Sequence, residues 1–229
     1  ADDGSDFGAE IAQQYAHLFI RLEYLWRPND HNLSRSRNIG AGAALGEHLL
    51  FINSDVLLNP RAIRAYLSCL EQYPQATIWG YIGCRKAVTA PSLWYPEIRV
   101  NWLDFRFFPL NDQELWQHSD LSHCPYRLAG GHHFAMPTHI WQKIGPMNEG
   151  FVYWGEEDIE YALRGLLADV SMVFLGDAWA EHIHHDYNET FHLKASREKA
   201  FKNKHIKQLE AQLTQQKPAF ISFTDEHKN

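Results

Sequence analysis

The sequence has 229 residues, of which 45% are hydrophobic and 21% charged, and its formal net charge is −7. This length and apolar content allow one large domain or two small ones, exclude a disulfide-stabilised miniprotein and argue against a disordered chain. The acidic balance disfavours a nucleic-acid binder, and no apolar run approaches the roughly 20 residues of a membrane-spanning helix.

Helices and strands alternate in the first third of the chain. The pattern predicts helices over residues 8–22, over 34–45 with Ser34 as a possible cap, and from Pro60 onward, and strands over 25–26, 49–52 and 76–82. The continuous apolar run 49–52 is typical of a strand covered on both faces. In the helix after Pro60, we expect Ile63, Tyr66, Leu67 and Leu70 to form the buried face.

The middle of the chain is less regular. Residues 83–126 contain many aromatic side chains and no clear periodicity, which favours a functional insertion. A Gly130-Gly131 turn, helices over 139–144 and 156–167, and strands over 171–175 and 178–183 follow. The alternation predicts one α/β domain with a mostly parallel sheet.

The last region, 196–216, is charged and helical. Phe201, His205, Leu209 and Leu213 form a stripe with a spacing of four. This stripe favours packing on the same domain or on a partner and leaves a peripheral contact with a membrane open. The three cysteines are odd in number and far apart, which is typical of reduced thiols in a cytoplasmic protein.

Three polar clusters follow strands or begin helices. Asp55 ends the cluster after strand 49–52, where it could serve a turn or hold a divalent cation. The acids of residues 156–158 begin a helix, where they could cap it or supply a general base. His182 and His184 lie on one face of the last strand, where they could be surface residues or metal ligands.

Taken together and in order, these clusters resemble the metal-dependent glycosyltransferases of the GT-A fold. The likeness is greatest to family 2 enzymes with a galactosyltransferase-type C-terminal half, including chondroitin-polymerase and polypeptide N-acetylgalactosaminyltransferase domains. The matching stretches are Asp-Asp-Gly-Ser at 2–5, Ser-Arg-Asn-Ile-Gly at 36–40, the strand with its Asn-Ser-Asp at 46–55, Ala-Gly-Gly at 129–131, residues 145–151, Trp-Gly-Glu-Glu-Asp at 154–158, and His-Ile-His-His at 182–185. Asn53 stands where the family usually has Asp, and Glu156 where it usually has Gly.

The resemblance implies a UDP-sugar donor, a carbohydrate acceptor and a Mn²⁺ or Mg²⁺ ion. It assigns the nucleotide to Asp3, Arg37, Asn53 and Asp55, the metal to Asp55 and His182, and the sugars to Trp154, Gly130, Gly131 and Glu157. Asp158 would be the general base, with Glu157 beside it, in an inverting transfer of bacterial polysaccharide biosynthesis. His132 and His133 could also contact the diphosphate or sugar.

The same resemblance implies a domain division and a missing neighbour. Residues 1–190 would form an N-terminally incomplete catalytic domain, and 191–229 a helical tail. Since residues 2–5 match the end of the family's second strand, a preceding segment or another chain is expected to fill the sheet position beside strand 49–52.

Two other functions stay open from the residues alone. One is a non-catalytic carbohydrate-binding or assembly module on the same fold. The other is a zinc hydrolase with ligands among His132, His133, His182, His184 and His185, which the lack of a His-Glu-x-x-His motif disfavours.

Overall fold

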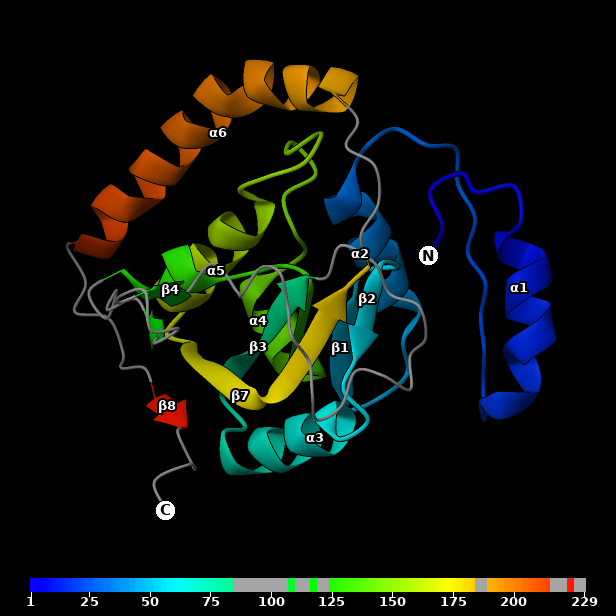
Figure 1. Cartoon of the computed structure of the whole chain (residues 1–229). Helices are drawn as coiled ribbons and strands as arrows, with labels where there is room; N and C mark the ends of the chain where they lie inside the picture. The colour runs from blue at the N-terminus through cyan, green and yellow to red at the C-terminus, as the bar shows by residue number, and fades with distance from the viewer. Residues whose placement is uncertain (85–106, 110–115, 119–123, 184–188, 215–221, 225–229) are drawn as a thin grey trace.

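The computed structural model describes residues 1–84, 107–109, 116–118, 124–183, 189–214 and 222–224 (Figure 1). Most of the region 83–126 therefore lies outside the described residues, as do His184 and His185. Within it, β4 (Phe107–Pro109) and β5 (Trp116–His118) form an antiparallel pair, and Pro125–Leu128 form a short 3-10 helix, η3.

A six-stranded mixed sheet forms the centre of the described structure. Its strands are β1 (His48–Ile52), β2 (Val56–Leu58), β3 (Ala76–Cys84), β6 (His133–Pro137), β7 (Ser171–His182) and β8 (Ser222–Thr224). The order is β1-β6-β3-β7-β2, with β8 also on β7. β7 runs parallel to β3 and to β8, whereas β6 is antiparallel to β1 and β3, and β2 is antiparallel to β7.

The prediction of a mostly parallel sheet is therefore wrong. The strands responsible are β2, which is antiparallel to β7, and β6, which lies antiparallel between β1 and β3; the sequence analysis missed both. The longer of the two is β6. All five of its residues are buried, so it lacks the alternation of polar and apolar residues that would reveal a half-exposed strand.

β7 also differs from its prediction, because it is one long strand instead of two. Leu175 lies opposite Gly80 and Trp179 opposite Tyr81, so the residues between Leu175 and Trp179 form an irregularity. The break seen in the sequence is thus a local bulge within a continuous strand. At the other side of the sheet, β1 is an edge strand, and none of the described residues pairs with its outer edge.

The described part of the chain contains eight helical segments. They are α1 (Gly8–Tyr15), η1 (Ala16–Leu18), α2 (Leu33–Ala43), α3 (Ala62–Gln72), η3, α4 (Thr138–Ile144), α5 (Glu157–Leu167) and α6 (Glu189–Thr214). The predicted first helix is thus shorter, and none of the residues of α1 is buried. The cap of α2 is Asn32 in place of Ser34, because its side-chain oxygen accepts the amide hydrogen of Arg35 at 3.0 Å.

The apolar face of α3 is rotated from its predicted position. Tyr66 and Leu70 are buried, but Ile63 and Leu67 are exposed. The small residues Ala62 and Cys69 complete the buried face. The predicted face was therefore correct at only two of its four positions.

The two faces of the sheet carry separate apolar clusters. Neighbouring residues alternate between them: Trp79 and Phe174 pack in the cluster of α5, whereas Ile78 and Val173 pack in the cluster of α3. In Figure 1, α3 lies on one side of the sheet, with α5 on the other. No helix in the described part of the chain has the length and hydropathy needed to cross a membrane.

Candidate functional site

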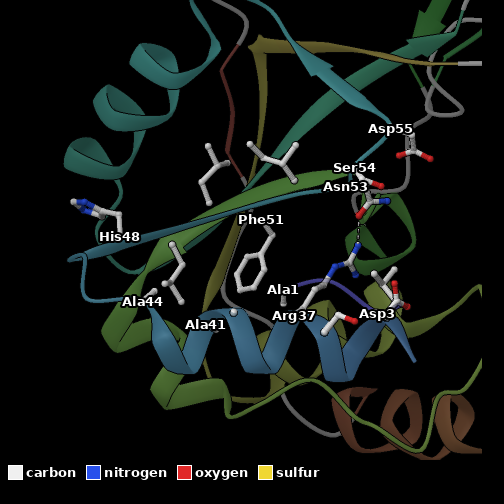
Figure 2. Close-up of a pocket in the computed structure, with 16 residues that line it drawn as sticks. Ala1, Asp3, Arg37, Ala41, Ala44, His48, Phe51, Asn53, Ser54 and Asp55 are labelled. Atoms are coloured by element: carbon white, nitrogen blue, oxygen red, sulfur yellow. Dashed lines mark hydrogen bonds between the residues drawn. The ribbon is translucent and has the colours of Figure 1, made fainter. Parts of the chain in front are cut away.

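A pocket of about 540 Å³ lies between α2 and β1. In Figure 2, Asp3, Arg37, Asn53 and Asp55 gather at one end of it, and His48 and Ala44 lie at the other. All four residues assigned to the nucleotide therefore line the same pocket. The end formed by α2 and the residues after β1 is polar, and the rest follows the open edge of β1.

The two carboxylates of the Asp-Asp-Gly-Ser stretch, Asp2 and Asp3, have different surroundings. Asp2 accepts hydrogen bonds from the amides of Gly4 and Ser5 at 3.0 and 2.9 Å and from the Tyr24 hydroxyl at 2.7 Å. These hydrogen bonds, with that of the Ser5 hydroxyl as the largest influence, lower the pKa of Asp2 to about 2. Asp2 thus holds the turn, whereas Asp3 lines the pocket.

Arg37 connects the pocket to the second half of the chain. Its guanidinium group donates to Asn53 Oδ1 at 2.9 Å and to the carbonyl oxygen of Gly131, and it lies 3.8 Å from Glu157 Oε1. It also lies 5.5 Å from the centre of the Phe134 ring. The side chain is buried, so it works as an internal junction between α2, β1, the Gly130-Gly131 turn and α5.

The start of α5 completes this junction. Asp158 Oδ2 accepts the amide hydrogen of Gly131 at 2.8 Å, and Glu157 Oε2 accepts that of Gly155 at 2.9 Å. A Cβ atom at Gly131 would lie 3.1 Å from both Arg37 Nη2 and Asp158 Cβ, so glycine permits this close approach. The structure thus brings Asp158, Glu157, Gly131, Arg37 and Asn53 into one network.

Burial shapes the charges in this network. Burial raises the pKa of Glu157, Asp158 adds to the effect, and the positive charge of Arg37 opposes it. Burial likewise lowers the pKa of Arg37, while Glu157 and Asp158 oppose that change. The charged form of each group is therefore stabilised by the opposite charge of the other, since a buried charge without a counter-charge is strongly unfavourable.

The residues assigned to the metal meet at the ends of β1 and β7. His182 Nε2 lies 3.2 Å from Asp55 Oδ2, and this hydrogen bond is the main reason why the pKa of His182 is raised. The His132 ring lies edge-on to His182, with 5.8 Å between the ring centres. No group of three or more His, Cys, Asp or Glu side chains with metal-binding geometry occurs among the described residues.

A carboxylate and an imidazole nevertheless fit a divalent ion that is shared with a ligand. Mg²⁺ is commonly bound by one or two carboxylates together with substrate phosphates, and imidazole is a further common metal ligand. Asp55 and His182 could supply the protein's share of such a site, with a diphosphate supplying the rest.

His133 has a different position from the one considered in the sequence. Its Nδ1 is 2.7 Å from the Tyr66 hydroxyl, and its Nε2 is 3.0 Å from the carbonyl oxygen of Tyr81. The side chain is buried and hydrogen-bonded in the core. It is therefore not available for a diphosphate, a sugar or a zinc ion, which removes one ligand from the hydrolase hypothesis.

The residues assigned to the sugars differ in exposure. Trp154 is 61% exposed, whereas Gly130 and Gly131 are buried. Sequence reasoning missed Asn38, whose side chain donates to the Met147 carbonyl at 2.9 Å and accepts its amide hydrogen at 2.8 Å. It also missed the buried Lys202, because α6 is polar and gives no sign of which lysine points inward.

Comparisons with known proteins found one family model and several related proteins. The model of "Glycosyl transferase family 2" matches residues 1–129. Polypeptide N-acetylgalactosaminyltransferase 11 of Xenopus tropicalis is 28% identical over 173 residues, covering 73% of this chain and 28% of that protein. Chondroitin synthase of Escherichia coli is 25% identical over 187 residues, covering 72% of this chain and 27% of that protein.

A solved structure supports the fold. The crystal structure of GalNAc-T7 with UDP, GalNAc and Mn²⁺ superposes with a TM-score of 0.55 at 16% identity, covering 80% of this chain and 36% of that one. The chain thus shares the fold of the part of that protein that it covers. It spans less than a third of the length of the two curated relatives named above.

Proposed function

The chain belongs to glycosyl transferase family 2, and from this we propose that it transfers a sugar from a UDP-sugar to a hydroxyl group of a carbohydrate acceptor. The GT-A resemblance found in the sequence is confirmed by the family match and the shared fold. UDP and Mn²⁺ are present in the GalNAc-T7 structure, which supports a UDP-sugar donor and a divalent ion for this chain.

The observation that carries the proposal is the contact network around Arg37. It joins Asn53, at the polar end of the pocket, to Gly131, whose amide is bound by Asp158. A donor in the pocket and an acceptor at the start of α5 would therefore bind to two parts of the same hydrogen-bonded network. This arrangement suits a direct transfer between two bound molecules.

In this proposal, the donor's nucleotide lies along the pocket. Asp3 receives the uracil, Asn53 faces the ribose, and Arg37 lies near the phosphates. Asp55 and His182 hold the divalent ion, with Mn²⁺ or Mg²⁺ as the candidates. When bound, such an ion stabilises the negative charge that develops on the UDP leaving group.

Asp158 is the proposed general base. It accepts the proton of the acceptor hydroxyl while the acceptor oxygen bonds to the anomeric carbon and the bond from that carbon to the diphosphate breaks. The products are UDP and the new glycoside, and a single displacement inverts the anomeric configuration. Asp158 lies in the first turn of α5, and its Oδ2 accepts the amide hydrogen of Gly131, which fixes the side chain beside the Gly130-Gly131 turn.

Glu157 and Trp154 are assigned to the sugars. Glu157 is a buried carboxylate that Gly155 and Arg37 hold in place, and it would accept hydrogen bonds from sugar hydroxyls. Trp154 is exposed and would offer its ring as a platform for a sugar face. Gly130 and Gly131 would form the adjoining wall.

The wider setting is proposed on the same basis. Residues 1–190 are the proposed catalytic domain and 191–229 the proposed tail of a cytoplasmic enzyme of polysaccharide biosynthesis. Among the described residues of that tail, α6 packs on the domain and β8 pairs with β7. The partners of the enzyme are the nucleotide-sugar and the carbohydrate acceptor.

The direct test is release of UDP from UDP-sugars with a panel of carbohydrate acceptors. The proposal predicts Mn²⁺- or Mg²⁺-dependent release that requires an acceptor and falls at least about 100-fold in Asp158→Asn, as expected for loss of a general base. NMR of the product should show the opposite anomeric configuration to the donor. Sugar binding without UDP release for any acceptor would instead identify a non-catalytic module.

A further inference from the structure

Lys202 is a buried lysine in the middle of the polar helix α6, with only 2% of its surface exposed. Its Nζ lies 3.2, 3.2 and 3.0 Å from the carbonyl oxygens of Tyr153, Trp154 and Gly155. A lysine ammonium group has three N–H donors, so each of them has one carbonyl acceptor. The same nitrogen lies 5.8 Å from the centre of the Phe151 ring.

The loop that receives these hydrogen bonds has an unusual backbone. Tyr153, Gly155 and Glu156 have φ angles of 61°, 105° and 71°, all in the left-handed region. Non-glycine residues occupy this region mainly where their surroundings hold them there. Lys202 binds the carbonyl oxygens of this loop directly, and the stacked pair His31 and Tyr153, with ring centres 5.2 Å apart, supports its other side.

The loop leads directly into the proposed catalytic acids. Residue 156 is the N-cap of α5, and the amide of Gly155 is bound by Glu157 Oε2. Any shift in the carbonyl groups of residues 153–155 would therefore move Trp154 and the carboxylate of Glu157 together.

The helix that carries Lys202 is itself fixed to the domain. Ile206 and Leu213 are buried in the same apolar cluster as α5, and His205 Nε2 lies 3.2 Å from Glu160 Oε1. The stripe expected in the sequence is thus confirmed at Leu213, which is buried, and at Leu209, which packs against the same cluster, whereas in the preceding turns the buried residues are Lys202 and Ile206, each one position after the expected one. Phe201 is 52% exposed.

We propose that Lys202 is a positioning residue, which holds the loop 153–155 so that Trp154 and the start of α5 face the acceptor sugar. This inference rests on the proposed function for its effect on transfer, but the position of Trp154 can be measured without any substrate. Through Lys202, α6 would thus help to shape the acceptor side of the site.

The test compares Lys202→Met with Lys204→Met, a control two residues along α6 at an exposed lysine. Both proteins are labelled with 5-fluorotryptophan, and Trp154→Phe identifies the fluorine signal of Trp154. We expect Lys202→Met to shift or broaden that signal while the signals of the buried Trp79 and of other tryptophans stay in place. UDP affinity with Mn²⁺ should stay within about twofold of wild type, whereas the acceptor KM rises at least about tenfold.

If Lys202→Met does not fold, a second variant, Lys202→Arg, tests the proposal. Lys202→Arg keeps the charge, but its planar fork cannot reproduce the three hydrogen bonds of an ammonium group, so the Trp154 signal should still move. An unmoved Trp154 signal in the folded variants overturns the proposal. A moved signal without transfer to any acceptor would leave the positioning role intact and count against the proposed function.

Discussion

Removing the positive charge of Arg37 should strongly destabilise the domain. Arg37→Met would leave Glu157 buried without its ion-pair partner, whose guanidinium group lies 3.8 Å away, and would remove the donor to Asn53 and Gly131. Loss of one partner of a buried pair costs about 3–5 kcal/mol. For a domain of this size, each kcal/mol corresponds to about 2–4 °C, so Tm should fall by about 6–20 °C.

The measurement is thermal and urea denaturation of a matched set of variants. Arg35→Met is the control, because the Arg35 side chain is 44% exposed and its ion pairs with Asp30 and Glu149 lie at the surface, where each is worth about 0–1 kcal/mol. The double variant Arg37→Met/Glu157→Gln should be more stable than the sum of the single effects by at least about 1 kcal/mol. Additive effects, or an Arg37→Met loss below about 1 kcal/mol, would refute the buried pair.

Three further predictions concern Glu157, Trp154 and His182. Burial raises the pKa of Glu157, so its protonated form stabilises the fold below the ordinary carboxyl pKa of about 4.3, and this stabilisation is lost as pH rises through the raised value. The Tm of Glu157→Gln minus the Tm of wild type should therefore increase over this pH range. A constant difference in thermal scans contradicts this prediction. Trp154→Ala should change the unfolding free energy by less than about 0.5 kcal/mol, because the side chain is exposed, yet raise the acceptor KM about tenfold in steady-state assays; an unchanged KM removes its sugar role. His182→Ala should weaken Mn²⁺-dependent UDP binding at least about tenfold in calorimetry, and unchanged Mn²⁺ dependence would leave Asp55 as the sole described donor.

The polar residues at the ends of the strands could be predicted from local signals. Asp55 follows a continuous apolar run and His182 ends another strand, so both were expected at strand ends where one ion could join them. The structure places their side chains 3.2 Å apart. The helix at 156–167 was equally clear, because acids begin it and an apolar stripe follows, and α5 spans Glu157–Leu167.

The partners of buried polar groups could not be predicted in the same way. Nothing in the local pattern around Arg37 indicates that it reaches Gly131, which lies 94 positions away in sequence. Lys202 is similar, since its partners are backbone carbonyl groups, which leave no mark in a sequence. β6 was missed because a short strand buried on both faces has no alternation to detect.

Calorimetric titration of UDP, with and without Mn²⁺, into the wild-type chain and Asp55→Ala tests the central claim most directly. The pocket between α2 and β1, with Asp55 at its polar end and His182 beside Asp55, predicts UDP binding tighter than 1 mM with Mn²⁺, a threshold of about −4.1 kcal/mol. Binding should weaken at least about tenfold without the ion or in Asp55→Ala. Absence of UDP binding at millimolar ligand with Mn²⁺, or equal binding in all these conditions, would contradict a metal-dependent nucleotide-sugar site in this chain.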